Sequence, residues 1–201
     1  MLIPIWYAVL FAVCFIIYFI LLVICLTSRK LYPEFSIFRD TISEVQDTSM
    51  KTSKYINPAF ALIGIVLLPL PVFLLDYMPR AGLTNIAILI LYCNPLGLII
   101  LSIWPNFTNN MHYIGAGIAM GGTLLAMILL FLPILRSQYI SNVILIISIF
   151  ALIICIPLVY SNVTNGPRSE LIHNPNIWEW LEFFTLQLFI IALYLNLVIA
   201  K

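Results

Sequence analysis

Charged residues are scarce in this sequence. Only 8% of its 201 residues are Asp, Glu, Lys or Arg, whereas 63% are hydrophobic. A soluble domain carries roughly 25% charged residues, so this chain cannot cover itself with the usual polar surface. The formal net charge is only +1, and no basic stripe is present that would neutralise phosphate groups. We therefore expect neither a soluble globular protein nor a nucleic-acid partner.

Diagnostic cysteine patterns and catalytic motifs are also missing. The sequence contains no CxxC, HExxH or GxSxG motif, and all four cysteines lie inside apolar runs. Such cysteines are typical of small buried hydrophobic side chains rather than of disulfides or metal ligands. The sequence therefore indicates no particular cofactor, and it leaves open whether the protein is an enzyme.

Long apolar runs dominate what is present. A transmembrane helix needs about 20 largely apolar residues, and lipid offers the backbone no hydrogen-bond partners, so each run must be helical. We predict an all-α fold, a polytopic membrane helical bundle that forms a single integral membrane domain over residues 1–201. Its six transmembrane helices are expected at residues 2–27, 58–75, 83–104, 111–132, 140–160 and 177–200.

Prolines and glycines punctuate these runs. Four prolines should bend their helices, because proline lacks a backbone donor: Pro69, Pro71, Pro95 and Pro157. In the fourth helix, Gly117 and Gly121 have the GxxxG spacing that lets a second helix approach closely, with Gly115, Ala119 and Gly122 on a neighbouring face. The partner helix lies either in this chain, which we favour, or in another membrane protein.

Ionisable residues gather on one side of the membrane if the chain crosses it six times. Seven of the eight acidic residues and both histidines lie in the first, third and fifth loops or at the helix ends beside them. The long first loop also carries Phe35, Phe38 and Ile42 at helical spacing. We expect this loop either to lie on the membrane surface as an amphipathic helix or to cap the bundle.

This polar end of the bundle carries the candidate site residues. His112 is expected in the first turn of the fourth helix, shortly after two asparagines that are suitable N-caps. His112, Glu182 and Glu44 are candidate catalytic groups, with the histidine acting as a general base. Alternatively, His112 and His173 could hold a divalent metal together with carboxylates. A third hypothesis is a binding site for a lipid headgroup. The simplest interpretation is that these residues are hydrated, paired with one another, or capping helix ends.

The stretch NPNIWEWLEFF opens the sixth predicted helix and contains two of the acidic residues. Trp178 and Trp180 fit the aromatic belt at the headgroup level. Asn176 is a suitable N-cap, which places Glu179 three residues later, at the positive end of the helix dipole. Glu179 can therefore be explained as a helix-start residue, while it also stays a candidate binding residue.

Glu182 lies one turn deeper in the membrane and is harder to explain. A carboxylate at mid-bilayer costs about 2.5–3.5 kcal/mol even on the lenient insertion scale, so such a residue should face protein or a wet cavity. We expect Glu182 to have a partner, either Arg168 or His112. We therefore rank Glu182 above Glu179 as a site residue.

Three blocks of the sequence resemble a family of six-helix membrane proteins, the domain-of-unknown-function 998 family. They are RDTISEVQD before the second helix, PNFTNNMHYIGAGIAM in the fourth, and NGPRSELIHNPNIWEW before the sixth. The first block departs from the family, because EVQ replaces the usual Asp-Leu-Gly. The ISE and EW elements are also similar to the related damage-regulated autophagy modulator group. The resemblance implies no particular reaction, but it implies that five candidate binding residues share one locality: Ser43, Glu44, His112, Arg168 and Glu182.

Three functions remain open on the sequence alone. The protein could bind or process the headgroup of a membrane lipid at its polar end. It could instead be a non-catalytic subunit or scaffold of a membrane complex, with partner chains at the Gly117/Gly121 face. It could also transport a small solute, although no charged residue lies near the middle of any predicted helix.

The orientation of the chain in the membrane has conflicting signals. The acidic side carries six of the nine Lys and Arg residues, which by the positive-inside rule favours placing that side in the cytoplasm. The first loop is long, so its basic residues carry less weight under this rule. The family resemblance also suggests that the loops with the motifs are external. We place the termini in the cytoplasm.

Overall fold

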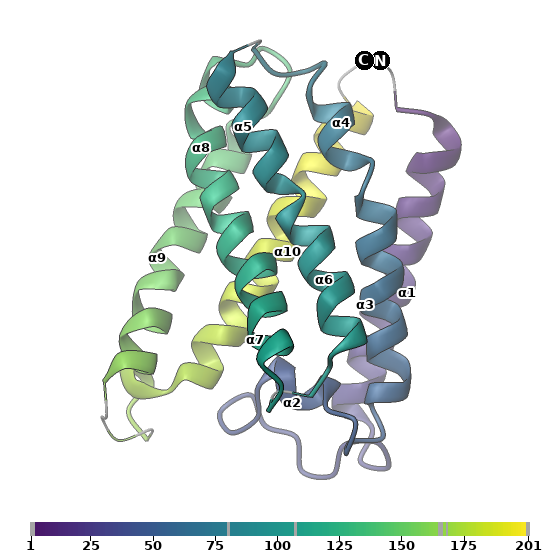
Figure 1. Ribbon diagram of the computed structural model, residues 1–201, viewed down its shortest axis with the longest axis vertical. Helices are drawn as coiled ribbons and strands as arrows, with labels where there is room; N and C mark the ends of the chain where they lie inside the picture. The colour runs from purple at the N-terminus through teal and green to yellow at the C-terminus, as the bar shows by residue number, and fades with distance from the viewer. Residues whose placement is uncertain (1–2, 80, 107, 165–166, 168, 200–201) are drawn as a thin grey trace.

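Six helical spans, each long and apolar enough to cross a membrane, make up the computed structural model in Figure 1. The structure describes residues 3–79, 81–106, 108–164, 167 and 169–199, and these residues form helices and loops without a strand. The predicted all-α, six-helix membrane bundle is confirmed. The spans are α1 (Ile5–Thr27), α3 with α4 (Ser53–Leu67 and Leu70–Leu74), α5 with α6 (Gly82–Leu91 and Cys93–Ile103), α7, η1 and α8 in succession (Asn110–Ala116, Gly117–Gly121 and Gly122–Arg136), α9 (Val143–Val163) and α10 (Pro175–Ile199).

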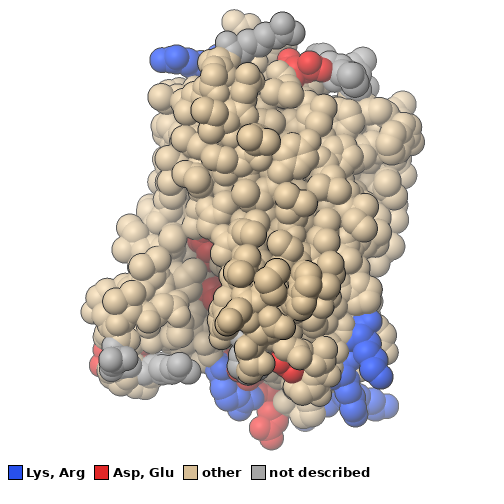
Figure 2. Space-filling view, viewed as in Figure 1, with Lys and Arg blue, Asp and Glu red and all other residues tan. Residues whose placement is uncertain are grey.

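The two ends of the bundle differ in what they carry. Both termini lie at one end, and the long first loop lies at the other (Figure 1). Charged side chains gather at these two ends, and the broad band between them is almost free of charge on the face that Figure 2 shows. Large apolar side chains point outward along this band, for example Ile153 and Ile156 of α9, which are 55% and 69% exposed. Such a surface is suited to lipid.

The core is formed where neighbouring spans pack in pairs. α1 packs on α3, α3 on α6, α5 on α8, and α9 on α10. Large aromatic side chains fill the space between them, including Tyr7, Phe11, Phe60 and Phe189, each no more than 2% exposed.

Several helix boundaries differ from the prediction, most clearly in the second, fourth and fifth spans. The second span begins at Ser53 rather than at residue 58, the fourth runs to Arg136 rather than to residue 132, and the fifth covers 143–163 rather than 140–160. The prediction followed the apolar runs, whereas backbone hydrogen bonding continues into polar residues at the membrane surface. The later start of α9 has a local cause, because the Ser137 hydroxyl accepts the N–H groups of Tyr139 and Ile140 and holds them in a turn.

Prolines interrupt two of the spans. The second span breaks between α3 and α4 at Leu68 and Pro69, and the third breaks at Tyr92 between α5 and α6. The ring of a helical proline clashes with the carbonyl group four residues earlier, and for Pro95 that carbonyl belongs to Leu91, the last residue of α5. By contrast, α9 continues through Pro157 as one helix.

Close packing of α6 uses small residues other than the predicted glycine pair. A Cβ atom at Gly97 would lie 2.4 Å from the backbone nitrogen of Ala119. A Cβ atom at Gly122 would lie 2.2 Å from the Cβ of Cys93. A side chain at either glycine would therefore push α6 away from the η1 and α8 segments.

The GxxxG pair itself faces away from the described part of the bundle. No described atom lies within 4 Å of a Cβ atom added at Gly117 or Gly121. The prediction that this pair packs against a helix of the same chain is therefore wrong. The physical reason is that η1 is a turn of π-helix, whose wider winding changes which residues face a neighbour. A partner from another protein at this face stays a prediction.

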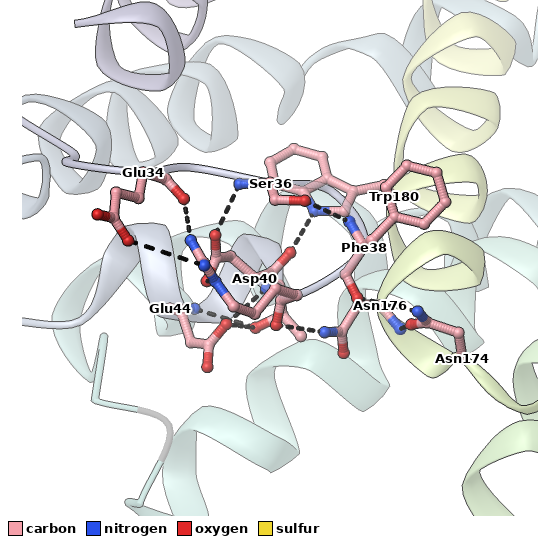
Figure 3. A network of polar contacts seen from close by, with 10 residues as sticks. Glu34, Ser36, Phe38, Asp40, Glu44, Asn174, Asn176 and Trp180 are labelled. Carbon is pink, nitrogen blue, oxygen red and sulfur yellow. Dashed lines mark hydrogen bonds and ion pairs between the residues drawn. The ribbon is translucent and has the colours of Figure 1, made fainter. Parts of the chain in front are cut away.

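The first loop caps the bundle and does not form an amphipathic helix along the membrane. Residues 28–52 contain one short helix, α2 (Ile42–Gln46). Three side chains at the start of α10 donate hydrogen bonds to loop carbonyl groups (Figure 3): Asn174 to Phe38 at 2.9 Å, Trp180 to Asp40 at 2.7 Å, and Asn176 to Arg39. These bonds fix the loop over the end of the bundle.

Buried aromatic residues reinforce this cap. Phe35 packs edge-on against both Tyr32 and Trp180, with ring centroids 5.5 Å and 5.7 Å apart. Burial, followed by the negative charge of Asp40, raises the pKa of Tyr32 to about 12, so its phenol stays neutral at physiological pH. Trp180 is only 2% exposed, so its predicted place in a lipid-facing aromatic belt is wrong.

The start of α10 also differs from the prediction. The helix begins at Pro175, and the side chain of Asn174 accepts the backbone N–H of Asn176 at 3.1 Å. Asn174 is therefore the capping residue instead of Asn176, because proline is favoured at the first position of a helix, where its missing N–H is not needed. Glu179 consequently lies deeper in the helix than its predicted capping-box position.

Candidate functional site

A capping box starts the short helix α2, and the side chain of Ser43 in this helix contacts the bundle. The backbone N–H of Thr41 donates to the Glu44 carboxylate at 2.6 Å, and the backbone N–H of Glu44 donates to the Thr41 hydroxyl at 3.2 Å. These reciprocal bonds start a helix that would be too short to form alone. They occupy the Glu44 carboxylate, while Ser43, next to it, contacts residues of two other spans.

His112 is one of those residues. Asn109 caps the helix by accepting the backbone N–H of Met111 at 2.8 Å, which places His112 in the first turn of α7, as predicted. The imidazole is 1% exposed. Its Nδ1 lies 3.2 Å from the Trp104 carbonyl oxygen, and its Nε2 lies 3.0 Å from the Ser43 hydroxyl. Because a carbonyl oxygen can only accept, Nδ1 carries a proton.

Glu179 is the third member of the group. The Ser43 hydroxyl lies 3.5 Å from a carboxylate oxygen of Glu179, a weak hydrogen bond at most. Ser43, from α2, thus stands between His112, from α7, and Glu179, from α10. We call these three residues the mouth cluster. Its single hydroxyl proton can serve only one neighbour at a time, so the other neighbour is left to accept a hydrogen bond from a ligand.

The mouth cluster lies at one end of a cavity of about 270 Å³ inside the bundle. Residues of α2, α3, α6, α7, η1, α9 and α10 line it. Much of the wall is apolar: Phe60, Leu98, Leu101, Met120, Phe183 and Leu186. The cavity therefore joins a polar end, close to the membrane surface, to an apolar interior at the depth of the lipid chains.

The cavity reaches the outer surface between α7 and α9. Tyr113 of α7 is 61% exposed and Asn162 of α9 is also exposed, and both line the cavity. Figure 2 shows a hollow on this face of the molecule, with acidic side chains visible at its bottom. A molecule in the surrounding membrane can therefore approach the cavity from the side.

Three buried carboxamides were missed by the sequence analysis. Asn94, Gln187 and Gln46 all line the cavity, and each has one side-chain polar atom without a hydrogen-bond partner among the described residues. The signal that would have revealed Asn94 and Gln187 is a polar amide in the middle of an apolar run. Only charged residues at that depth entered the prediction.

Glu182 is buried and makes no hydrogen bond to the mouth cluster among the described residues. Its side chain is 0% exposed, and neither carboxylate oxygen has a hydrogen-bond partner among the described residues. It lies close enough to Cys155 of α9 to interact with it electrostatically. The prediction that His112 pairs with Glu182 is wrong, because the His112 ring nitrogens contact Ser43 and Trp104 instead. The other predicted partner, Arg168, lies outside the described residues.

His173 belongs to a different part of the polar end. Its Nδ1 lies 3.0 Å from the Thr164 hydroxyl, its Nε2 lies 3.8 Å from the Glu170 carboxylate, and its ring is 5.4 Å from that of Tyr160. His173 shares none of these neighbours with His112. Among the described residues, no group of three or more His, Cys, Asp and Glu side chains could hold a metal ion.

Comparisons with known proteins add no name to this arrangement. No family model, no curated protein and no solved structure matches the chain. The resemblance to the six-helix family of unknown function therefore stays a prediction, and the function has to be argued from the site itself.

Proposed function

We propose that this integral, multi-pass membrane protein binds an amphipathic lipid, whose headgroup contacts Ser43, His112 and Glu179. The observation that carries the proposal is the cavity of about 270 Å³ with the mouth cluster at its polar end. Ligand sites are typically concave and mostly apolar, with a few polar groups that fix orientation. A lipid has the same division, because its headgroup is polar and its chains are apolar.

The position of the cavity supports a ligand that arrives from the membrane. The side opening lies between α7 and α9, next to outward-facing apolar residues of α9. The mouth cluster lies beside Trp104, just beyond the end of α6, which is the depth of lipid headgroups. A lipid that moves sideways into the opening can therefore bring its headgroup to the mouth cluster without leaving the membrane.

The same geometry favours binding over catalysis. Ser43 and His112 have the contact of a nucleophile and its general base, at 3.0 Å. An attack by Ser43 on an ester would, however, move negative charge onto the ester's carbonyl oxygen. That oxygen is bound to the carbon that the serine attacks, and the Glu179 carboxylate lies only 3.5 Å from the serine oxygen. Catalysis of acyl transfer requires hydrogen-bond donors at that place, and a carboxylate opposes the charge instead.

The test is lipid retention by the purified protein. The protein is purified in a mild detergent, and the lipids that remain bound are identified and counted by mass spectrometry. We expect about one retained lipid per chain, and we expect His112→Ala and Glu179→Gln to weaken its binding about tenfold each, the effect of one good hydrogen bond. Thermal unfolding of each variant checks that the fold persists.

His173→Ala is the matched control for these variants. It removes the second histidine at the same end of the bundle, where the side chain contacts Thr164 and Glu170 instead of the cavity. Its lipid retention should equal that of the unmodified protein. Unchanged retention in both His112→Ala and Glu179→Gln would refute the proposed headgroup site.

A further inference from the structure

Polar groups continue along the cavity beyond the mouth cluster. Asn94 lies ten residues before Trp104, and Gln187 lies eight residues after Glu179. At about 1.5 Å per helical residue, these amides lie roughly 12–15 Å deeper in the membrane than the mouth cluster. They are 2% and 3% exposed, and both line the cavity. The inner part of the cavity therefore has two polar side chains in a mostly apolar wall, at a depth where apolar residues are the rule.

The orientation of the Asn94 amide is fixed by its neighbours. The Thr123 hydroxyl donates its only proton to the Ala119 carbonyl oxygen. Its oxygen must therefore accept from the Asn94 amide nitrogen, which lies 3.0 Å away. The Asn94 carbonyl oxygen is left buried and without a partner among the described residues. A ligand that satisfies it has to present an O–H or N–H donor.

The two other amides of the cavity, Gln187 and Gln46, require different kinds of hydrogen-bond partner. The Gln187 carbonyl oxygen and the Gln46 amide nitrogen are likewise buried without partners among the described residues. The first needs a donor and the second needs an acceptor. A hydroxyl group can serve as either, because it carries one proton and two lone pairs.

Charge selects against the common ionic headgroups. No Lys or Arg is found among the described residues that line the cavity, and the ionisable ones are His112, Glu179 and Tyr113. These three lie near the mouth. A phosphate would therefore meet no cation along the wall, and an ammonium group would meet no carboxylate beside the deeper amides.

The backbone is irregular where the deeper amides lie. The third span breaks at Tyr92, two residues before Asn94, and the fourth contains the π-helical turn Gly117–Gly121, which includes Ala119. Turns of π-helix inside α-helices are found frequently at functional sites. Two spans thus depart from regular α-helix beside the same part of the cavity.

From these contacts we infer that the inner cavity recognises an uncharged group with several hydroxyls, a polyol such as a sugar. Asn94 and Gln187 supply the deeper hydrogen-bonding side chains, and Gln46, three residues after Ser43 in α2, supplies one nearer the mouth. Phe60 and Phe183 supply apolar wall for the C–H faces of such a ring. This inference rests on the proposed lipid site and narrows it to lipids with a polyol headgroup that inserts into the cavity. A free polyol would present the same chemistry.

Two matched lipids test the inference. The protein is placed in phosphatidylcholine nanodiscs, and binding is titrated with monogalactosyl diacylglycerol or with the methyl ether of diacylglycerol carrying the same acyl chains. The two probes differ in the sugar, and the ether has no hydroxyl donor. We expect the galactolipid to bind at least about tenfold more tightly, because a site built for hydroxyl groups rejects a ligand that leaves its polar groups unpaired.

Variants of the two deeper amides identify the contact. Asn94→Leu and Gln187→Leu should each weaken galactolipid binding about tenfold and leave binding of the ether unchanged. The thermal unfolding temperature of Gln187→Leu should not fall, because the change removes a buried polar atom that lacks a partner among the described residues. Asn85→Leu is the matched control, since Asn85 is an exposed amide of the same span outside this cavity.

The outcomes separate this inference from the proposed function. Equal binding of both lipids, or galactolipid binding that neither variant weakens, would overturn the polyol site while leaving lipid binding intact. If no lipid is retained or bound, the proposed function fails as well. Methyl β-galactoside distinguishes the source of the polyol: competition with the galactolipid supports recognition of a free sugar, and its lack supports a sugar attached to lipid.

Discussion

At the scale of single residues, Glu182 is the most unusual group in the structure. It is completely buried between α9 and α10, and its oxygen atoms have no hydrogen-bond partner among the described residues. A buried polar group without a partner costs about 1–3 kcal/mol, because it has lost water and gained nothing in return. This cost applies whether or not the carboxyl group carries a proton.

We therefore expect Glu182→Met to stabilise the fold. The methionine fills a similar volume and has no carboxyl group to desolvate, so the free energy of unfolding should rise by about 1–3 kcal/mol in detergent. Thermal or denaturant unfolding measures this change. Glu34→Met is the control, because that side chain is 86% exposed and its replacement should change stability by no more than about 0.5 kcal/mol. A loss of stability in Glu182→Met would instead show that the carboxyl group has a stabilising partner.

At the scale of elements, the contact between the first loop and α10 decides where Ser43 lies. α2 is too short to hold a position by itself, and the loop before it is fastened to α10 through Trp180, Asn174 and Asn176 (Figure 3). The position of Ser43 opposite His112 therefore depends on hydrogen bonds made several residues away. A change at Trp180 should affect the site without touching it.

Trp180→Phe tests this dependence. The variant keeps most of the aromatic packing and removes the donor to Asp40, so the loop should open more often. We expect faster trypsin cleavage at Arg39 and weaker lipid retention. Trp178→Phe serves as the comparison, because its indole N–H donates to Leu171 and not to the loop. Equal cleavage rates in the two variants would contradict the anchoring role of Trp180.

The third and fourth spans each contain a glycine, Gly97 and Gly117, and this pair gives a second prediction at this scale. Gly97→Ala should destabilise the fold by about 1–3 kcal/mol, because the added carbon would overlap the backbone of Ala119. Gly117→Ala should instead leave it unchanged or stabilise it by about 0.5–1 kcal/mol, since the site is open and alanine favours helix. Unfolding temperatures in detergent measure both changes.

Gly117→Ala also tests the hypothesis that the protein is a scaffold to which partner chains bind. If a partner chain packs at the Gly117/Gly121 face, the variant should lose that partner in native membranes, although it is stable in detergent. Co-purification from native membranes compares the variant with the unmodified protein.

At the scale of the whole molecule, six crossings determine which loops meet. The first loop, the α6–α7 turn and the α9–α10 connection share one end of the bundle, and the termini share the other (Figure 1). This arrangement brings Ser43, His112 and Glu179 together from positions far apart in the sequence. The site therefore exists only if these segments lie on the same side of the membrane.

Labelling of introduced cysteines checks this topology. In a variant without native cysteines, Ile37→Cys and Glu170→Cys should react with a membrane-impermeant reagent from the same side, and Tyr139→Cys should react from the other side. Ile37 and Tyr139 are 42% and 62% exposed, so all three tests use accessible positions at the bundle ends. The predicted cytoplasmic location of the termini requires that Tyr139→Cys react only after the cells are opened. Reaction of Ile37→Cys and Glu170→Cys from opposite sides would contradict the fold.

The sequence by itself determined the membrane location, the all-α class, the six spans and the gathering of polar residues at one end. These follow from composition and run length, because lipid forces every apolar segment of sufficient length to be helical. It also placed His112 in a first helical turn, through the local chemistry of an asparagine cap. Such features depend on residues that are close together in the chain.

Only the tertiary structure decided which polar residues meet. The sequence ranked Glu182 above Glu179, assigned Trp180 to lipid, and gave no weight to Asn94 or Gln187. In the fold, Glu179 reaches Ser43, Trp180 holds the loop, and the two amides line the cavity. These outcomes depend on the rotation of each helix about its axis and on the breaks and π-helical turn along it. Packing against other spans sets those rotations, and no short stretch of sequence encodes them.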